Sequence, residues 1–282
     1  MTLQANVRDQ LQKLLAQAQA DEIRQLNNAL RLLSKWRSIL LQNTVLQKHG
    51  TKVWQGPLAG LDFVAKSTEG CLVAKLLGCY EQPLFPFLED VIASQYATLV
   101  NIGCSEGYYA VGLARRMPNT IVHAFDINPI AQDTCRLLAE KNGVVDRVQV
   151  GALFSPSDFA KYTGQHVLVF CDIEGAEQAL LDPMATPALT GMDLIVESHE
   201  CFVPGITKTL VERFQETHDI TLVQDNGQRK LTNTPAWFNN LAHLDQLLAA
   251  WEWRSGPTPW LIMKSKARGA SPTATNEESK AK

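Results

Sequence analysis

From residue 97 to residue 225 the sequence alternates short apolar runs with longer amphipathic runs, and this alternation limits the possible folds most strongly. The short runs are rich in Val, Ile and Leu and predict buried strands, at 97–103, 120–127, 147–153, 166–173, 192–200 and 219–225. The amphipathic runs predict helices, at 108–117, 129–143, 155–164, 177–189 and 205–218. Strands that alternate with helices at this spacing predict an α/β fold with a doubly wound, mostly parallel, Rossmann-like sheet.

The rest of the sequence divides into an extension, a cap, the remainder of the α/β domain and a tail. Residues 1–50 predict an N-terminal helical extension, because 7–48 contains neither Pro nor Gly and its leucines recur at helical spacing. A cap segment is expected at 51–90, where glycines interrupt short apolar pieces. The α/β domain is expected to span 91–266, with a C-terminal helix in PAWFNNLAHLDQLLAAWEW (235–253) and a late edge strand from 260 onward. Residues 267–282 are small, polar and charged and predict a disordered tail.

The N-terminal extension has two possible uses. Leu26, Ala29, Leu33, Trp36 and Leu40 fit the apolar positions of two heptads, which would allow a homodimer seam. Two heptads are too few for a stable coiled coil, and amphipathic helices usually pack on their own domain. Packing within the chain is therefore the favoured interpretation, and a homodimer through this helix is the alternative.

Charge and hydropathy exclude several kinds of partner. The net charge of −3 provides no general basic field for nucleic acid. The apolar runs are far too short to span a bilayer, and the N-terminal MTLQANVRDQLQKLL lacks the apolar stretch of a signal peptide. The six cysteines are scattered without a CxxC pair, which favours buried reduced thiols over a zinc site. These features are typical of a cytoplasmic protein.

A glycine-rich turn follows the first predicted strand. In NIGCSEGYY (101–109), Gly103 and Gly107 bracket the turn that leads into a helix, where the chain must pass close to a ligand. Asp126 ends the next strand, in the position that binds ribose hydroxyls in nucleoside sites. The predicted cofactor contacts all lie at the ends of strands or in the turn after the first strand; they are Asn101, Gly103, Cys104, Ser105, Glu106, Gly107, Tyr108, Asp126, Ile127, Ala152, Leu153 and Asp172.

The charges around this turn favour one nucleoside cofactor over another. A dinucleotide would place its pyrophosphate over the turn, where Glu106 would repel it and Tyr108 would hinder close packing. S-adenosylmethionine (SAM) has no phosphate and carries a sulfonium and an ammonium, which suit Glu106 and Asp172. The sequence therefore predicts SAM as the cofactor in preference to NAD.

Several motifs together resemble those of a known family. The segments VNIGCSEGYYAVGLA, FDINP, DIEGAE and LIVESHE, preceded by GCYE at 78–81, are similar to class I SAM-dependent methyltransferases, most closely the FkbM-type enzymes. The resemblance covers about residues 76–225. It departs at Asn101, where these enzymes commonly have an acid near the methionine ammonium.

The resemblance implies transfer of the SAM methyl group to a hydroxyl of a small molecule or glycan. A nucleic-acid methyltransferase is disfavoured by the net charge and by the absence of an N/D-P-P-Y/F motif. The alternatives from other classes are an NAD-linked oxidoreductase on a Rossmann sheet and a SAM-binding protein without catalytic activity.

The fifth predicted strand ends in candidate catalytic residues. Glu197 and His199 would share one face of an extended strand, and His199 is the natural general base at neutral pH. In the alternative mechanism, Asp172, Glu197 and His199 bind a divalent cation that acidifies the acceptor hydroxyl. A base without a metal is the favoured interpretation. Glu177 is expected to be a solvated or capping acid.

Two residues outside these motifs carry weaker expectations. His218 is expected to end a helix and to interact with its C-terminus. Arg254 lies in the turn-rich EWRSGPTPWL and is a candidate for contact with the acceptor.

Overall fold

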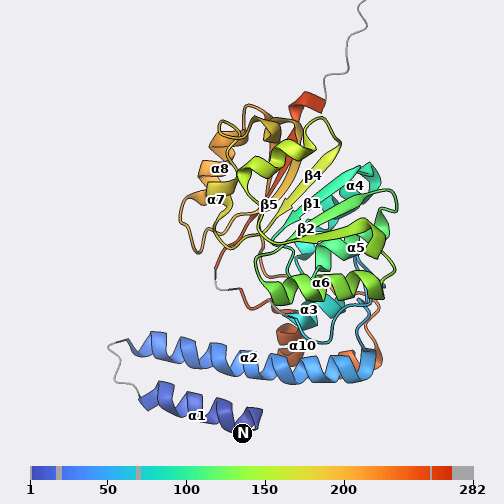
Figure 1. Ribbon diagram of the computed structural model, residues 1–282. Coiled ribbons are helices and arrows are strands. Elements are labelled where there is room, and N and C mark those ends of the chain that lie inside the picture. The colour runs from blue at the N-terminus through green and yellow to red at the C-terminus, as the bar shows by residue number, and fades with distance from the viewer. Residues whose placement is uncertain (1, 17–20, 68–70, 255, 269–282) are drawn as a thin grey trace, which may run out of the picture.

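A single twisted sheet forms the centre of the protein. The computed structural model describes residues 2–16, 21–67, 71–254 and 256–268, and within them seven strands pair in the order β3-β2-β1-β4-β5-β7-β6 (Figure 1). The strands are β1 (Thr98–Ile102), β2 (Ile121–Phe125), β3 (Val148–Gly151), β4 (Val167–Cys171), β5 (Asp193–Glu197), β6 (His218–Val223) and β7 (Trp260–Ser265). β7 runs antiparallel to both neighbours, β5 and β6, and the remaining pairs are parallel. The predicted doubly wound, mostly parallel sheet is confirmed.

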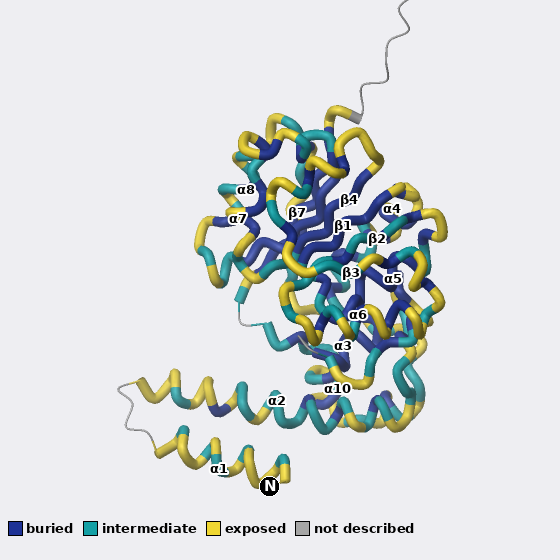
Figure 2. The backbone as a smooth tube through the Cα atoms, viewed as in Figure 1, coloured by how far each residue is buried: buried dark blue, intermediate teal, exposed yellow. Residues whose placement is uncertain are grey.

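Alternating side chains of the central strands enter two separate cores. Leu99 and Phe170 belong to the core under α4 (Phe85–Ser94), α5 (Tyr108–Arg116) and α6 (Pro129–Lys141). Val100 and Val169 belong to the core under α7 (Glu177–Leu180) and α8 (Ile206–Phe214). Because successive residues of a strand point to opposite faces, a continuous apolar run buries both faces of the sheet. Figure 2 shows these strands as the most buried part of the chain.

The position of β7 corrects one prediction. The segment from 260 was expected to be an edge strand, but β7 lies between β5 and β6, and nearly all of its residues are buried. β6 is the edge strand instead, and its middle residues are exposed or half-buried. The more apolar of the two last strands, WLIMKS, therefore takes the covered position.

Two predicted helices are shorter than expected. The helix predicted at 177–189 ends after one turn, at Leu180, since Pro183 and Pro187 cannot continue it. The predicted C-terminal helix divides into α9 (Ala236–Asn239) and α10 (His243–Ala250). His218 is the first residue of β6 and bonds the Met192 carbonyl at 2.8 Å through Nε2, so it does not cap a helix.

The N-terminal extension is a pair of helices that lies beside the α/β domain (Figure 1). α1 (Leu3–Ala16) packs on α2 (Glu22–His49), which begins at an Asp21 cap and ends at Gly50. α2 contacts α10 and α3 (Leu72–Leu77), which lie between it and the sheet. Among the described helices, none combines the length and apolarity needed to cross a membrane. The predicted disordered tail, except Ala267 and Arg268, lies outside the described residues.

Candidate functional site

Two cavities meet where the carboxyl ends of β1 and β4 lie side by side. The apolar cavity, of about 400 Å³, is lined by the ends of β2 and β3, with Asp126, Ile127 and Leu153 on its walls. The acidic cavity, of about 290 Å³, reaches toward the N-terminal extension and includes Glu197 and His199. Both cavities share the residues Gly103, Asp172 and Glu174. One elongated ligand could therefore occupy both.

The glycine-rich turn allows this junction to form. Gly103 has φ +77°, and a Cβ on it would lie 1.6 Å from the Asp172 carbonyl oxygen, so a side chain would separate the ends of β1 and β4. Gly107, with φ +92°, directly precedes α5. The backbone N–H of Ser105 donates to Asp126 Oδ2 at 2.8 Å, which attaches the turn to the end of β2.

The cofactor-contact residues predicted after the strands are divided between the two cavities. Asp126, Ile127, Ala152 and Leu153 line the apolar cavity. Asn101, Cys104, Ser105 and Tyr108 line the acidic cavity, and Gly103 and Asp172 line both. Glu106 and Gly107 are absent from the described lining of either cavity.

Glu106 faces the interior instead of a ligand site. Its carboxylate is fully buried and accepts from the Lys75 ammonium at 2.8 Å and from Ser105 Oγ at 2.5 Å. Burial alone would raise the pKa of Glu106, but the charge of Lys75 and its hydrogen bond outweigh burial and lower the pKa to about 2. Lys75 therefore neutralises the charge that was expected to attract the cofactor. No motif around Lys75 indicated this pairing.

Asn101 presents an unpaired acceptor to the acidic cavity. Its side chain is 1% exposed, and Nδ2 donates to the Phe170 carbonyl at 3.3 Å. Within the described part of the chain, its buried Oδ1 has no hydrogen-bond partner. Buried acceptors are nearly always satisfied, so this oxygen is a candidate for a ligand donor.

His199 lies at the centre of four carboxylates. Its Nδ1 lies 2.7 Å from Glu177 Oε1. Its Nε2 lies 3.5 Å from Asp172, 3.4 Å from Glu174 and 3.7 Å from Glu197. Burial would lower the pKa of His199, but the Glu177 hydrogen bond and the other carboxylates outweigh it and raise the pKa.

Glu177 contradicts its predicted role as a solvated acid. Its side chain is fully buried, and Oε1 accepts from the backbone N–H groups of Ile173 and Gly175 at 3.2 Å as well as bonding His199. Burial opposes its ionisation, but these hydrogen bonds lower the pKa of Glu177. Because the ionised carboxylate only accepts, His199 Nδ1 carries the proton and Nε2 faces the cavity. The sequence signal that could have indicated this role is the placement of three acids within the six residues of DIEGAE.

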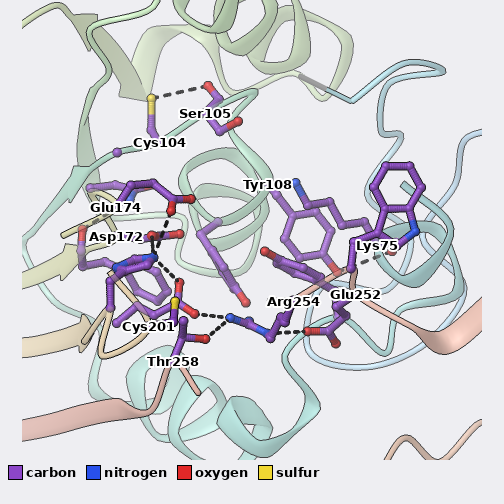
Figure 3. Close-up of a pocket in the computed structure, with 18 of the residues that line it drawn as sticks. Lys75, Cys104, Ser105, Tyr108, Asp172, Glu174, Cys201, Glu252, Arg254 and Thr258 are labelled. Carbon is purple, nitrogen blue, oxygen red and sulfur yellow. Dashed lines mark hydrogen bonds and ion pairs between the residues drawn. The ribbon is translucent and has the colours of Figure 1, made fainter. Parts of the chain in front are cut away.

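A second cluster, around Arg254, borders the same cavity. Arg254 bonds Glu197 and lies 2.7 Å from Glu81 and 3.2 Å from Glu252. Figure 3 shows Arg254 between Thr258 and Glu252. The predicted acceptor contact is thus occupied by carboxylates of the protein. Burial and the charge of Glu197 raise the pKa of Glu81 to about 7. Burial and the charges of Glu197 and Glu81 raise the pKa of Asp172 well above its ordinary value. Neither Glu81 nor Glu252 was among the predicted site residues.

The residues that converge as a candidate metal site differ from the predicted set. Oxygens of Asp172 and Glu174 and a ring nitrogen of His199 all lie within 4.8 Å of one another. Glu174 therefore takes the place expected for Glu197, whose carboxylate bonds Arg254. Carboxylate and imidazole ligands suit a divalent cation, and a carboxylate on the second imidazole nitrogen is typical of metal-bound histidines.

Backbone strain concentrates at this site. In the described residues, six non-glycine residues have positive φ, and four of them border the cavities or their clusters. These are Glu81 (φ 51°), Ser105 (φ 46°), Glu174 (φ 55°) and Trp253 (φ 64°). Strained conformations persist where the surrounding structure fixes them, which is common at functional sites.

The comparisons with known proteins concern structure alone. No protein-family model matches the sequence, and no curated protein sequence matches it. An O-methyltransferase from Bacillus cereus in complex with SAH matches with 16% identity over 66% of this chain and 81% of that chain, at a TM-score of 0.46. The human methyltransferase 10 domain containing protein matches with 10% identity over 82% of this chain and 97% of that chain, at a TM-score of 0.45. A precorrin-6y C5,15-methyltransferase from Geobacter metallireducens matches with 14% identity over 64% of this chain and 88% of that chain, at a TM-score of 0.41.

These matches are distant, and the arrangement of the strands carries the fold assignment. Six parallel strands with one antiparallel strand, β7, inserted between β5 and β6 are the hallmark of class I SAM-dependent methyltransferases. The chain has the class I SAM-dependent methyltransferase fold.

Proposed function

We propose that this protein is a SAM-dependent O-methyltransferase of the FkbM type that methylates a hydroxyl of a small molecule or glycan. The observation that carries the proposal is the junction of the two cavities at Gly103 and Asp172. A nucleoside in the apolar cavity would place its remaining atoms beside Asn101 and His199. The cavity volumes suit a nucleoside and a small acceptor.

The apolar cavity has the groups that a nucleoside requires. Asp126 accepts two backbone N–H groups, from Ser105 and Asn128, and each of its oxygens retains capacity for a ribose hydroxyl. Ile127 and Leu153 are 77% and 73% exposed, which leaves apolar surface for a base. Large exposed apolar side chains beside a cavity are typical of a ligand site.

The junction also suits the cationic end of SAM. The orphaned Oδ1 of Asn101 can accept from an ammonium. Burial and the neighbouring carboxylates raise the pKa of Asp172, and a bound cation would offset the charge of those carboxylates. Gly103, Cys104, Ser105, Gly107 and Tyr108 form the turn beside it. SAM would supply a methyl group attached to a positive sulfur. NAD carries a pyrophosphate, which the carboxylates at this junction would repel.

In this proposal His199 is the general base. Glu177 fixes its Nδ1–H, so the lone pair on Nε2 faces the cavity and can take the proton of an acceptor hydroxyl. Glu197, the second predicted catalytic residue, lies 3.7 Å from His199 but is bonded to Arg254. Its place is therefore to position His199 and the Arg254 cluster.

A metal-assisted version is the second candidate, because Asp172, Glu174 and His199 converge. These residues would hold a divalent cation, which would acidify the acceptor hydroxyl. His199 would then be a ligand, and Glu177 would orient it.

Support for the FkbM type comes from the position of its motifs. The Tyr-Glu element ends at Glu81, and DIEGAE begins at Asp172, far away in the sequence. In space both border the acidic cavity, since Glu81 bonds Arg254, and Arg254 and Asp172 line its wall.

Calorimetry with the demethylated cofactor, SAH, tests the proposed function. We expect SAH to bind the full chain and NADH not to bind. Asp126→Ala should weaken SAH binding at least about tenfold, since it removes charge-assisted hydrogen bonds, whereas the exposed control Asp133→Ala should not. Binding of NADH without SAH would favour the oxidoreductase. Binding of SAH without methyl transfer to any member of a hydroxyl-compound panel would favour a non-catalytic SAM-binding protein.

A further inference from the structure

The N-terminal extension contributes a cation to the acidic cavity. Lys35 of α2 lines that cavity, and its Nζ lies 5.3 Å from the centre of the Trp253 ring. The Trp253 indole N–H donates to Ser38 Oγ at 3.1 Å, also on α2. Trp253 has φ 64°, a conformation that bulky residues rarely adopt. Contacts with α2 therefore hold a strained aromatic residue at the cavity wall.

Lys35 differs from the other cations of the cavity. The Lys75 ammonium is paired with Glu106, and Arg254 is surrounded by Glu81, Glu197 and Glu252. Among the described residues, no carboxylate lies within ion-pair distance of Lys35, and its ammonium lies over the Trp253 ring. Of the lysines and arginines that line this cavity in the described part of the chain, Lys35 is the one whose charge is available to a ligand.

The cavity therefore has two electrically different parts. Asp172 and Glu174, at the sheet end, would repel an anion and suit the cationic part of SAM. Lys35 would attract an anion to the α2 wall. The volume of about 290 Å³ is near the lower limit of small-molecule sites, which leaves room for a single ring. Tyr80, Tyr108, Phe202 and Trp253 supply aromatic surface for that ring.

We infer that the acceptor is a single-ring hydroxyl compound that carries a carboxylate, which Lys35 binds while the ring packs against Trp253 and the hydroxyl faces His199. This inference rests on the proposed function and narrows its acceptor class. It also gives the N-terminal extension a role, as part of the acceptor site. The opposite orientation would place the carboxylate against Asp172 and Glu174, which is electrostatically unfavourable.

Calorimetry with a matched pair of probes tests the inference. The protein is first saturated with SAH, and 3,4-dihydroxybenzoate and its uncharged analogue 3,4-dihydroxybenzamide are then titrated separately. We expect the benzoate to bind about tenfold more tightly, because a hydrogen bond between charged groups is stronger than one to a neutral amide. Lys35→Gln should remove this preference and Lys35→Arg should keep it. Lys48→Gln, an exposed lysine of the same helix, is the control.

Each outcome separates the inference from the proposed function. Failure of SAH to bind would overturn the proposed function. If SAH binds but the two probes bind equally, or neither binds, the carboxylate acceptor is wrong. If Lys35→Gln keeps the preference for the benzoate, Lys35 is not the residue that recognises it. Unchanged SAH affinity in Lys35→Gln would show that the variant is folded.

Discussion

His199 Nδ1 and Glu177 Oε1 form a 2.7 Å hydrogen bond between a residue two positions beyond the end of β5 and the first residue of α7. Both side chains are almost completely buried, yet His199 lines the acidic cavity, and its Nε2 lies 3.5 Å from Asp172 and 3.4 Å from Glu174 of the same lining. A carboxylate that holds one imidazole nitrogen fixes which nitrogen is free for proton transfer. The pair therefore connects the DIEGAE segment to the end of β5 as one functional unit.

This pair leads to the first prediction. His199→Ala should lower turnover by about 100-fold or more, the usual range for a lost general base, while SAH affinity stays within about threefold. Glu177→Gln should lower turnover less, because a glutamine oxygen can still accept from Nδ1 but lacks the charge. His243→Ala, at an exposed histidine outside the cavity, is the control. Single-turnover kinetics and calorimetry give the two readouts, and unchanged turnover in His199→Ala would exclude His199 as the base.

The sheet was predictable from the sequence because its strands are buried on both faces. β1 lies within the apolar run 97–103 and β4 within 166–173, and all residues of both strands are buried. The order of the last two strands was not predictable, because β7 pairs with β5, a segment far away in the sequence, and no local pattern records that pairing.

The candidate site was predictable only where a motif follows a strand. Asp126 and Asp172 line the cavities because the carboxyl ends of parallel strands meet at one edge. Glu81, Glu252 and Arg254 come from irregular segments without periodicity, and only the folded chain brings them together. Glu177 begins a helix, a position where acids are usually exposed caps, and burial against His199 overrides that preference.

The second prediction separates the two mechanisms. If His199 is the base, dialysis against EDTA should leave turnover unchanged, and Glu174→Gln should reduce it by less than about threefold, since Glu174 is 61% exposed on its side chain. Loss of turnover after EDTA, restored by Mg²⁺ or Mn²⁺, would assign Asp172, Glu174 and His199 to a metal site. Electron paramagnetic resonance of added Mn²⁺ provides a readout that does not depend on turnover.

The third prediction concerns the buried ion pair of Lys75 and Glu106. Lys75→Met should destabilise the protein by about 3–5 kcal/mol, because it leaves a buried carboxylate without the cation that neutralises it. The double variant Lys75→Met with Glu106→Gln should recover much of that loss. Urea unfolding measures both free energies, with Lys66→Met, an exposed lysine, as the control. Equal stability of wild type and Lys75→Met would contradict the assigned role of the pair.

The same pair predicts a dependence of stability on pH. The folded-state pKa of Glu106 is about 2, below its ordinary value of 4.5, so its contribution is fully present above pH 4.5 and is lost as the pH falls toward 2. At 1.36 kcal/mol per pKa unit, the contribution is about 3 kcal/mol. In Glu106→Gln this part of the acid-induced loss of stability should be absent. If the free energy of unfolding falls with decreasing pH in the same way in wild type and variant, the prediction is wrong.

The fourth prediction tests whether α2 joins two copies of the chain. On α2, Ile23, Leu26, Leu30 and Leu33 are exposed at heptad spacing, whereas Ala29 of the originally expected seam is buried in its own chain. We propose that this exposed stripe pairs with the same stripe of a second copy, since a two-fold interface uses one surface twice.

Sedimentation velocity measures the outcome. The wild type should sediment as a dimer at micromolar concentration, and Leu26→Lys with Leu30→Lys should be monomeric, because each leucine contributes about 2 kcal/mol when buried and a lysine there would be desolvated. Asn43→Lys with Gln47→Lys adds the same two charges at exposed polar positions of α2 and should leave the dimer intact. A monomeric wild type, or a double variant that remains dimeric, would show that the stripe is not the interface. Because Lys35 belongs to the same helix, SAH affinity should be measured on both forms, and we expect it to be equal.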